Sequence, residues 1–247
     1  MPMKIVHVVE SFSAGSFSFL SDLTGMMTDA RHVIIHGRRE DTPNRFELYF
    51  PPETRFAFWK NAARSISPVA DVRALTELVA HLRSVGTFDA LHLHSSKAGF
   101  LGRLAARRLG IQNRCVYTAH GVSFLRRDVS PAMQAVFILL EKCGAALGGN
   151  VVACSESERE EFLKHNISAR VINNGVRFEP NVTPKRPDGI ITVGTCGRIT
   201  PQKVPDLFNQ IAEHFHGNPA VKFLWIGDGD LKHRLTAPNI EVTGWIP

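Results

Sequence analysis

The order of two hydrophobic periodicities constrains the fold of this chain most strongly. Short β-branched runs, typical of buried strands, alternate with segments whose apolar residues recur every three or four positions, as on one helix face. Strands are expected at 4–9, 32–36, 90–94, 114–119, 151–154 and 170–173. Helices are expected at 17–28, 69–84, 98–109 and 131–147, and another follows Ser155, which forms a capping-box pattern with Glu158. This alternation predicts an α/β protein with a parallel sheet covered on both faces.

A proline-rich segment separates two such series. Residues 179–189 contain three prolines and show no periodicity, which predicts a linker. Before it, residues 1–178 are expected to form a Rossmann-like doubly wound domain. After it, strands are expected at 190–196, 221–227 and 240–244, with a helix at 204–215. Independent domains typically contain about 100–150 residues. We therefore expect residues 190–247 to be an incomplete second domain.

The net charge of +6 is unevenly distributed. Residues 1–178 contain 22 basic and 16 acidic side chains, whereas residues 179–247 are balanced. A solvated basic surface and a polyanionic or membrane-surface partner are both open interpretations. The most apolar stretch, 135–147, is too short for the roughly 20 residues that span a bilayer. The four cysteines form no CxxC pair, so we expect reduced thiols in the cytoplasm.

The first strand leads into a turn that lacks a dinucleotide fingerprint. The segment from Glu10 to Ser16 contains one glycine, Gly15, where GxGxxG needs three, and the chain has no GxxxxGK[ST] motif. These features argue against NAD, FAD or P-loop nucleotide binding. The turn still opens a helix, whose N–H groups can hold a phosphate. A plain strand-to-helix turn is an equally good interpretation.

Three histidines attract attention in the first series. His92 and His94 point to the same face of a strand, but no carboxylate or thiol stands at ligand spacing, which favours packing and hydrogen bonding over a metal site. His120 directly follows strand 114–119, at the edge where open α/β sheets bind ligands. Either a structural or a functional role remains open for His120.

The second series repeats this arrangement with cations and glycines. Arg198 follows the first strand of the series and Lys203 precedes the next helix, a pattern that fits a diphosphate site and, equally, two surface cations. Gly227 and Gly229 follow the next strand, where backbone could approach a ligand closely.

Taken in order, these motifs resemble retaining glycosyltransferases of the GT-B fold, family 4, over nearly the whole chain. The versions HSSKAGFLGRLAAR and YTAHG look most like bacterial enzymes of O-antigen, capsule or lipid-linked oligosaccharide synthesis. The other matching segments are VVACSESERE (151–160), VINNGV (171–176), GRITPQKVPDLF (197–208), WIGDGDLK (225–232) and VTGWIP (242–247).

The resemblance implies a role for each candidate residue. His120 would be the catalytic residue near the transferred sugar, and Gly15 and Ser16 would line the acceptor side near the donor phosphate. Arg198 and Lys203, with Gly227 and Gly229, would bind the nucleotide-sugar, whose leaving diphosphate the two cations would stabilise.

The resemblance also implies the partners and the location. No metal is expected, because the family that the chain resembles needs none. No cofactor is expected either, since the nucleotide-sugar is a substrate. The acceptor would be a saccharide on polyprenyl diphosphate, reached by a peripheral protein at the cytoplasmic face of the cell membrane. The basic first domain suits an anionic membrane surface, and no nucleic-acid partner is expected. The aromatic and basic segment 55–60 fits an interfacial contact or a loop packed on the core equally well.

Four departures from the family pattern qualify this interpretation. Ala14 replaces the first of two usual glycines, Arg177 a usual Asp, and Val204 the Gly after the donor-side Lys. The family's Glu, seven residues, Glu motif would lie beyond Pro247. We therefore expect a glycosyltransferase whose activity is impaired in this C-terminally truncated form. The alternative is an inactive remnant or a membrane- or partner-binding module that retains the acceptor domain. A nucleotide-sugar epimerase or hydrolase would also fit the fold. Such an enzyme would need acid and base residues, which are not recognisable in this sequence.

Overall fold

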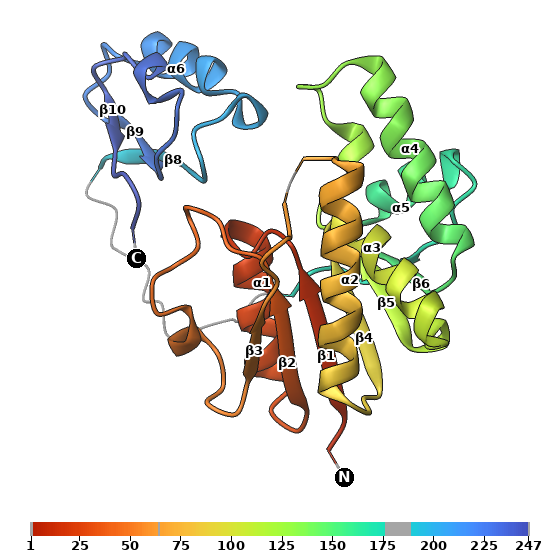
Figure 1. The fold of residues 1–247 in the computed structure, drawn as a ribbon. Coiled ribbons are helices and arrows are strands. Elements are labelled where there is room, and N and C mark those ends of the chain that lie inside the picture. Colours follow the sequence, from red (N-terminus) through yellow and green to blue (C-terminus); the bar gives the residue numbers. More distant parts are fainter. Residues whose placement is uncertain (1, 64, 176–188, 247) are drawn as a thin grey trace. The chain divides into compact units, whose positions relative to one another are not determined.

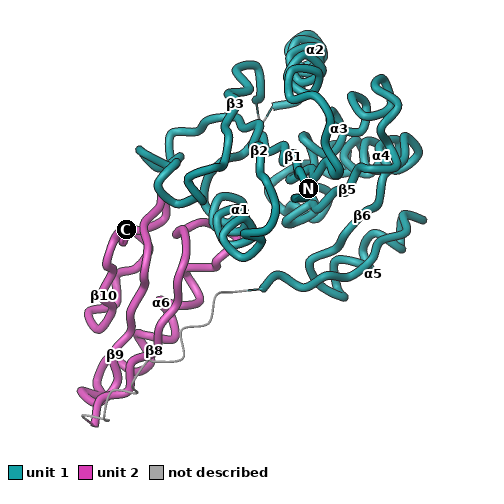
Figure 2. Tube along the Cα trace, turned by 90° about the horizontal axis from the view of Figure 1, so that it is seen from below, with its two compact units in different colours: residues 1–178 teal, residues 179–247 magenta. Residues whose placement is uncertain are grey.

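The structure, a computed structural model, describes residues 2–63, 65–175 and 189–246. The chain divides into two compact units, residues 1–178 (unit 1) and residues 179–247 (unit 2), drawn in teal and magenta in Figure 2. Both contain a parallel sheet with helices, as the ribbon in Figure 1 shows, which confirms the predicted α/β class. Of the predicted linker, only Gly189 lies among the described residues.

Unit 1 contains a sheet of seven parallel strands in the order β3-β2-β1-β4-β5-β6-β7. Its strands are β1 (Lys4–Val9), β2 (Arg31–His36), β3 (Arg55–Phe58), β4 (Ala90–His94), β5 (Cys115–Thr118), β6 (Asn150–Ala153) and β7 (Arg170–Val171). Six of them lie where the sequence predicts strands. The seventh, β3, forms part of the aromatic and basic segment for which no strand is predicted.

The helices of unit 1 also follow the predicted pattern. They are α1 (Ala14–Met26), α2 (Pro68–Val85), α3 (Ser96–Leu109), α4 (Pro131–Ala146) and α5 (Glu156–Lys164), with short 3₁₀ turns η1 (Phe46–Tyr49), η2 (Gln112–Arg114) and η3 (Ser123–Leu125). Proline opens α2 and α4, where its missing N–H costs nothing. The Ser155 hydroxyl caps α5 by accepting a hydrogen bond from the Glu158 N–H at 3.2 Å. Among the described residues, no helix is both long and apolar enough to cross a bilayer.

The two faces of this sheet differ in chemistry. On the face toward α2 and α3, alternate strand residues such as Val6, Ile35 and Leu93 form a continuous apolar core. On the opposite face, toward α1, a smaller apolar cluster that includes Phe17 and Leu20 shares the surface with buried histidines. The views in Figures 1 and 2 agree that α1 lies on the side of the sheet opposite α2.

The aromatic and basic segment 55–60 is mainly structural. Trp59 is fully buried, and its indole N–H donates a hydrogen bond to the Ala74 carbonyl in α2 at 2.9 Å. Phe58 remains exposed. The packing interpretation therefore applies to Trp59, because an indole with its N–H bonded inside the core cannot insert into a lipid interface.

Unit 2 contains a three-stranded parallel sheet in the order β10-β9-β8. Its elements are β8 (Ile191–Cys196), η4 (Pro201–Lys203), α6 (Pro205–His214), β9 (Val221–Ile226), η5 (Lys232–Arg234) and β10 (Ile240–Val242). Ala212, Phe223 and Ala237 form its small core. The buried Asn209 side chain on α6 accepts hydrogen bonds from the backbone of Thr236 and Ala237, which ties the helix to the segment before β10.

Candidate functional site

The candidate residues of unit 1 gather at one edge of the sheet. Because β1, β4, β5 and β6 are parallel neighbours, the residues that follow them meet at the carboxyl edge, where open α/β sheets bind ligands. Gly15 and Ser16 lie in the first turn of α1, which follows β1 and begins earlier than the predicted helix, and His120 follows β5. The structure therefore brings these predicted residues to the same edge of unit 1.

The buried Glu10 carboxylate links the segments that follow β1, β2 and β4 at this edge. Glu10, at the end of β1, accepts a hydrogen bond from the Arg39 guanidinium at 2.7 Å and another from the Ser95 hydroxyl. Gly37 allows this close packing, since a Cβ there would overlap the Glu10 carbonyl. Sequence reasoning did not assign Glu10 a function, although an acid that ends a buried apolar strand is itself a signal.

The first turn of α1 supplies backbone rather than hydroxyl groups to the edge. Gly15 is exposed, and the space around its Cβ position is open. The Ser16 hydroxyl donates to the carbonyls of Ser11 and Ser13, at 2.7 and 3.1 Å. Ser13 precedes the helix without a side-chain cap. The predicted phosphate contact at this turn is thus chemically reasonable for backbone N–H groups, and it remains a prediction.

His120 occupies a constrained turn. Its φ of 53° is left-handed, and Gly121 follows with a φ of 103°. The Glu158 carboxylate accepts hydrogen bonds from the Gly121 N–H at 3.1 Å and the Cys154 N–H at 2.6 Å, which joins this turn to the end of β6. Of the predicted capping box, the hydrogen bond from the Glu158 N–H to the Ser155 hydroxyl is therefore present. The Glu158 carboxylate instead holds the His120 turn.

Burial controls the protonation of His120. Its ring packs against Phe19 of α1, with ring centroids 4.5 Å apart. Burial lowers the pKa of His120 to about 4, so the imidazole is neutral at pH 7. A neutral imidazole has one N–H and one lone pair, and so it can exchange protons or hydrogen bonds with a ligand hydroxyl.

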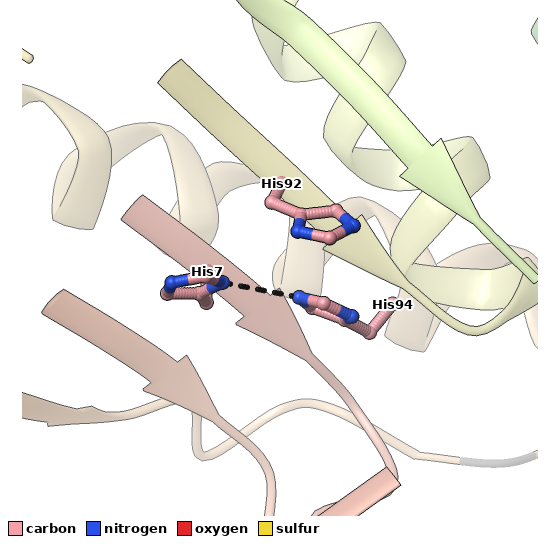
Figure 3. Close-up of side chains that lie close together, drawn as sticks. All are labelled: His7, His92 and His94. Carbon is pink, nitrogen blue, oxygen red and sulfur yellow. Dashed lines mark hydrogen bonds between the residues drawn. The ribbon is translucent and has the colours of Figure 1, made fainter. Parts of the chain in front are cut away.

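A group of buried histidines lies behind His120, on the α1 face of the sheet. His7 of β1 stands in register with His92 of β4, and Figure 3 shows both rings beside His94. His7 Nδ1 lies 3.2 Å from His94 Nε2, and His92 Nε2 lies 2.9 Å from the Thr118 hydroxyl oxygen. The predicted hydrogen bonding of His92 and His94 is therefore confirmed. Sequence reasoning missed His7, because only the sheet topology brings it to His92.

The same three histidines could in principle present ligands to a metal. One nitrogen from each of His7, His92 and His94 lies within 4.8 Å of the others. His7 and His94 are fully buried and His92 is partly buried, and burial lowers the pKa of each ring. The group itself contains no carboxylate to balance a divalent charge. The expectation that no metal is required is still a prediction.

In unit 2, the predicted cations lie on one loop after β8. Arg198 and Lys203 are both exposed, and the Lys203 side chain lies against the position that a Cβ on Gly197 would take. The Gly197 carbonyl accepts a hydrogen bond from the Trp225 indole at 2.8 Å, which fixes the start of the loop. The loop thus presents two cations on a backbone anchored to the sheet, and diphosphate binding there remains a prediction.

Gly227 and Gly229 have a packing role that the sequence did not indicate. A Cβ at Gly227 would overlap the Gly197 carbonyl, and one at Gly229 would overlap the Ile199 backbone. The Ile199 N–H donates to the Asp228 carbonyl at 2.9 Å. The glycines therefore let the loops after β8 and β9 pack backbone against backbone, and close approach to a ligand remains a prediction.

These features define a class of protein. Two units with parallel sheets, and candidate residues at the carboxyl ends of their strands, are the pattern of GT-B glycosyltransferases. Solved structures support the fold. Sucrose-phosphate synthase from Thermosynechococcus elongatus superimposes with a TM-score of 0.70 at 14% identity, over 99% of this chain and 71% of that one. An Anabaena protein in complex with UDP and glucose gives 0.71 at 17% identity, over 99% and 70%.

The chain belongs to glycosyltransferase family 4, whose model matches residues 22–179. A curated relative is the Escherichia coli UDP-Gal:α-D-GlcNAc-diphosphoundecaprenol α-1,3-galactosyltransferase, which is 31% identical over 212 residues. This match covers 76% of the present chain and 52% of the relative, so the chain spans about half the length of that enzyme. The family and the GT-B fold that the motifs indicate are thereby confirmed.

Proposed function

We propose that this chain provides the acceptor domain and part of the donor site of a glycosyltransferase. The reaction would transfer a sugar from a nucleotide diphosphate sugar to a saccharide carried on polyprenyl diphosphate, in bacterial surface polysaccharide synthesis. Family membership and the name of the E. coli relative support this assignment. The observation that carries it is the anchored loop with Arg198 and Lys203, since two cations beside a helix N-terminus match a diphosphate.

Nucleotide binding to the chain tests the donor half of this proposal. We expect UDP to shift the amide NMR signals of residues 197–204, and Arg198→Ala and Lys203→Ala each to weaken binding at least several-fold because a charge-assisted contact is lost. Lys222→Ala, which removes an exposed cation from β9, is the matched control. Binding that is undetectable, or unchanged in both loop variants, would favour the remnant interpretation.

Sugar transfer tests the reaction. UDP-[¹⁴C]galactose and a synthetic GlcNAc-diphosphoryl lipid are the first pair to use, because they reproduce the substrates in the relative's name. UDP-glucose and UDP-GlcNAc should follow. Labelled lipid product that depends on Arg198 would establish transfer. UDP binding without product from any pair would leave the chain a binding module.

The lipid part of the acceptor requires an apolar surface, and α4 offers one. Met133, Val136 and Leu139 are exposed along this helix. A cavity of about 620 Å³ beside it is lined by Ser65, Ile66, Arg126, Met133 and Phe137. An apolar helix on a unit with six excess positive charges has the composition of an interfacial contact. We therefore place the peripheral contact with the cytoplasmic membrane face at α4.

Vesicle sedimentation tests this contact. We expect the chain to bind vesicles that contain phosphatidylglycerol, with affinity that falls as salt rises. Leu139→Ser should weaken binding, whereas Leu48→Ser, at a still more exposed apolar position on η1, should not. Equal effects of the two substitutions, or salt-independent binding, would refute the assignment to α4.

A further inference from the structure

A single row of hydrogen bonds crosses the sheet of unit 1 from α1 to His120. The His32 Nε2 lies 3.1 Å from the Met27 carbonyl at the end of α1, and the His32 Nδ1 lies 3.1 Å from the His7 Nε2. The His7 Nδ1 lies 3.2 Å from the His94 Nε2, and the His94 Nδ1 lies 3.0 Å from the His120 Nε2. The row ends at the Cys154 sulfur, 3.8 Å from the His120 Nδ1.

The row takes one residue from each neighbouring strand. His32 lies on β2, His7 on β1 and His94 on β4, while His120 follows β5 and Cys154 follows β6, in the order of the strands in the sheet. His7, His32 and His94 are at most 2% exposed. Both ring nitrogens of each histidine in the row therefore have a partner inside the protein.

One end of the row can accept a hydrogen bond but not donate one. The Met27 carbonyl has no proton, so the His32 Nε2 must carry the hydrogen. In a neutral ring the His32 Nδ1 then carries a lone pair and no hydrogen. The His7 Nε2–H must therefore donate the hydrogen bond to it. The same step repeats at His94 and at His120. Every ring in the row consequently has its hydrogen on Nε2.

Burial keeps His7, His94 and His120 neutral, as this argument requires. It lowers the pKa of His7 and His94 well below the ordinary value and that of His120 to about 4. Burial also raises the pKa of the Cys154 thiol to about 11, so its S–H remains available to donate to the His120 Nδ1. The two ends of the row are therefore compatible with one direction of donation.

We propose that His32, His7 and His94 are positioning residues that hold His120 in its Nε2–H tautomer, so that the His120 Nδ1, which faces the Cys154 thiol, is a hydrogen-bond acceptor. In this state His120 can accept a hydrogen bond from a ligand hydroxyl that replaces the Cys154 S–H at Nδ1, but it cannot donate one to a phosphate oxygen. The use of that lone pair by a sugar hydroxyl rests on the proposed function. The tautomer itself does not, and it can be measured without any substrate.

A metal held by His7, His92 and His94 is the competing use of these side chains. It would need lone pairs from nitrogens that already bond to one another, namely the His7 Nδ1 and the His94 Nε2. Figure 3 shows these two atoms joined by a hydrogen bond, with the His92 ring tilted against the His94 ring. Because the trio supplies no negative charge, a divalent ion there would be buried without compensation.

Histidine NMR on the ¹⁵N-labelled 247-residue chain tests the proposal. Long-range ¹H–¹⁵N spectra at neutral pH should show His32, His7, His94 and His120 with a pyrrole-type Nε2 and a pyridine-type Nδ1. His32→Leu removes the anchor, so the His120 signals should move toward tautomer-averaged positions. His32→Asn keeps an acceptor for His7 and should preserve the His120 spectrum. His92→Leu, which removes a neighbouring ring outside the row, is the matched control.

Three results would overturn the proposal. The first is a wild-type His120 with its hydrogen on Nδ1, and this spectrum decides the question even if a variant fails to fold. The second is an unchanged His120 tautomer in folded His32→Leu. The third is stoichiometric binding of Zn²⁺ that shifts His7, His92 and His94 together, which would make the trio a metal site. Loss of UDP binding or of sugar transfer would affect only the proposed function.

Discussion

Acid should destabilise unit 1 in a pH range where carboxylates of ordinary pKa stay ionised. Burial lowers the pKa of His92 from 6.5 to about 3 and that of His120 to about 4. Below pH 6.5 the unfolded chain therefore binds protons at these positions that the folded chain does not. Because the unfolded state binds more protons, stability rises with pH and falls as pH drops below 6.5.

The size of the effect follows from the pKa difference. Between pH 6.5 and 5.0 each fully shifted histidine costs about 2 kcal/mol, at about 1.4 kcal/mol per pH unit. His92 and His120 together therefore cost about 4 kcal/mol, and His7 and His94, whose pKa values burial also lowers, add to it in the same direction. Since domains are stable by only about 5–15 kcal/mol, unit 1 should lose much of its stability by pH 5.

Urea unfolding at pH 7.5, 6.0 and 5.0 measures this loss. Pulse hydrogen exchange with mass spectrometry of peptides from β1 and β4 separates unit 1 from unit 2. His92→Leu is the informative variant, because it should reduce the pH slope by about 1.4 kcal/mol per unit whatever its stability at pH 7.5. An unfolding free energy of unit 1 that changes by less than about 1 kcal/mol between pH 7.5 and 5.0 would refute the reasoning.

Three substitutions test other parts of the structure. Val204→Gly should stabilise unit 2 by about 0.5–1 kcal/mol, because it relieves a β-branched residue at a φ of 50° that is half exposed, and a lower thermal midpoint would contradict this. Glu141→Leu should cost about 3–5 kcal/mol in urea unfolding, since it leaves Arg103 buried without its carboxylate, and adding Arg103→Met should recover part of the loss. Gly99→Ala should cost about 1–3 kcal/mol, because its Cβ would overlap the Tyr117 ring, and unchanged stability would show that the ring can move.

The sheet could be predicted because its signals are local. Central parallel strands read as continuous apolar runs, and each is followed by a helical period, so the order of elements follows from the sequence. β3 escaped prediction because its alternating Arg, Phe, Ala, Phe pattern at the edge of the sheet resembles an exposed aromatic segment. Its assignment needs the pairing with β2, which the sequence does not display.

The candidate site could be predicted only at its edge. His120, Gly15, Arg198 and Lys203 follow predicted strands, and the carboxyl-edge rule is enough to select them. The groups that hold them come from distant positions. Glu158 reaches the His120 turn across 37 residues of chain. A single sequence contains no signal that links such pairs, because their contact is created by the order of strands in the sheet.

One contact pattern can be explained from the sequence once the strand order is known. Histidines stand in three of the strand regions: His7 in the first, His32 and His36, four apart, in the second, and His92 and His94, two apart, in the third of these. Alternate positions share a face, so a parallel sheet that brings these strands together must carry a polar stripe on that face. A buried imidazole needs a partner for each nitrogen, and the nearest available partners are the other imidazoles. Hydrogen bonds between histidines are therefore the expected outcome of this pattern, and the strand order β2-β1-β4 determines which histidine contacts which.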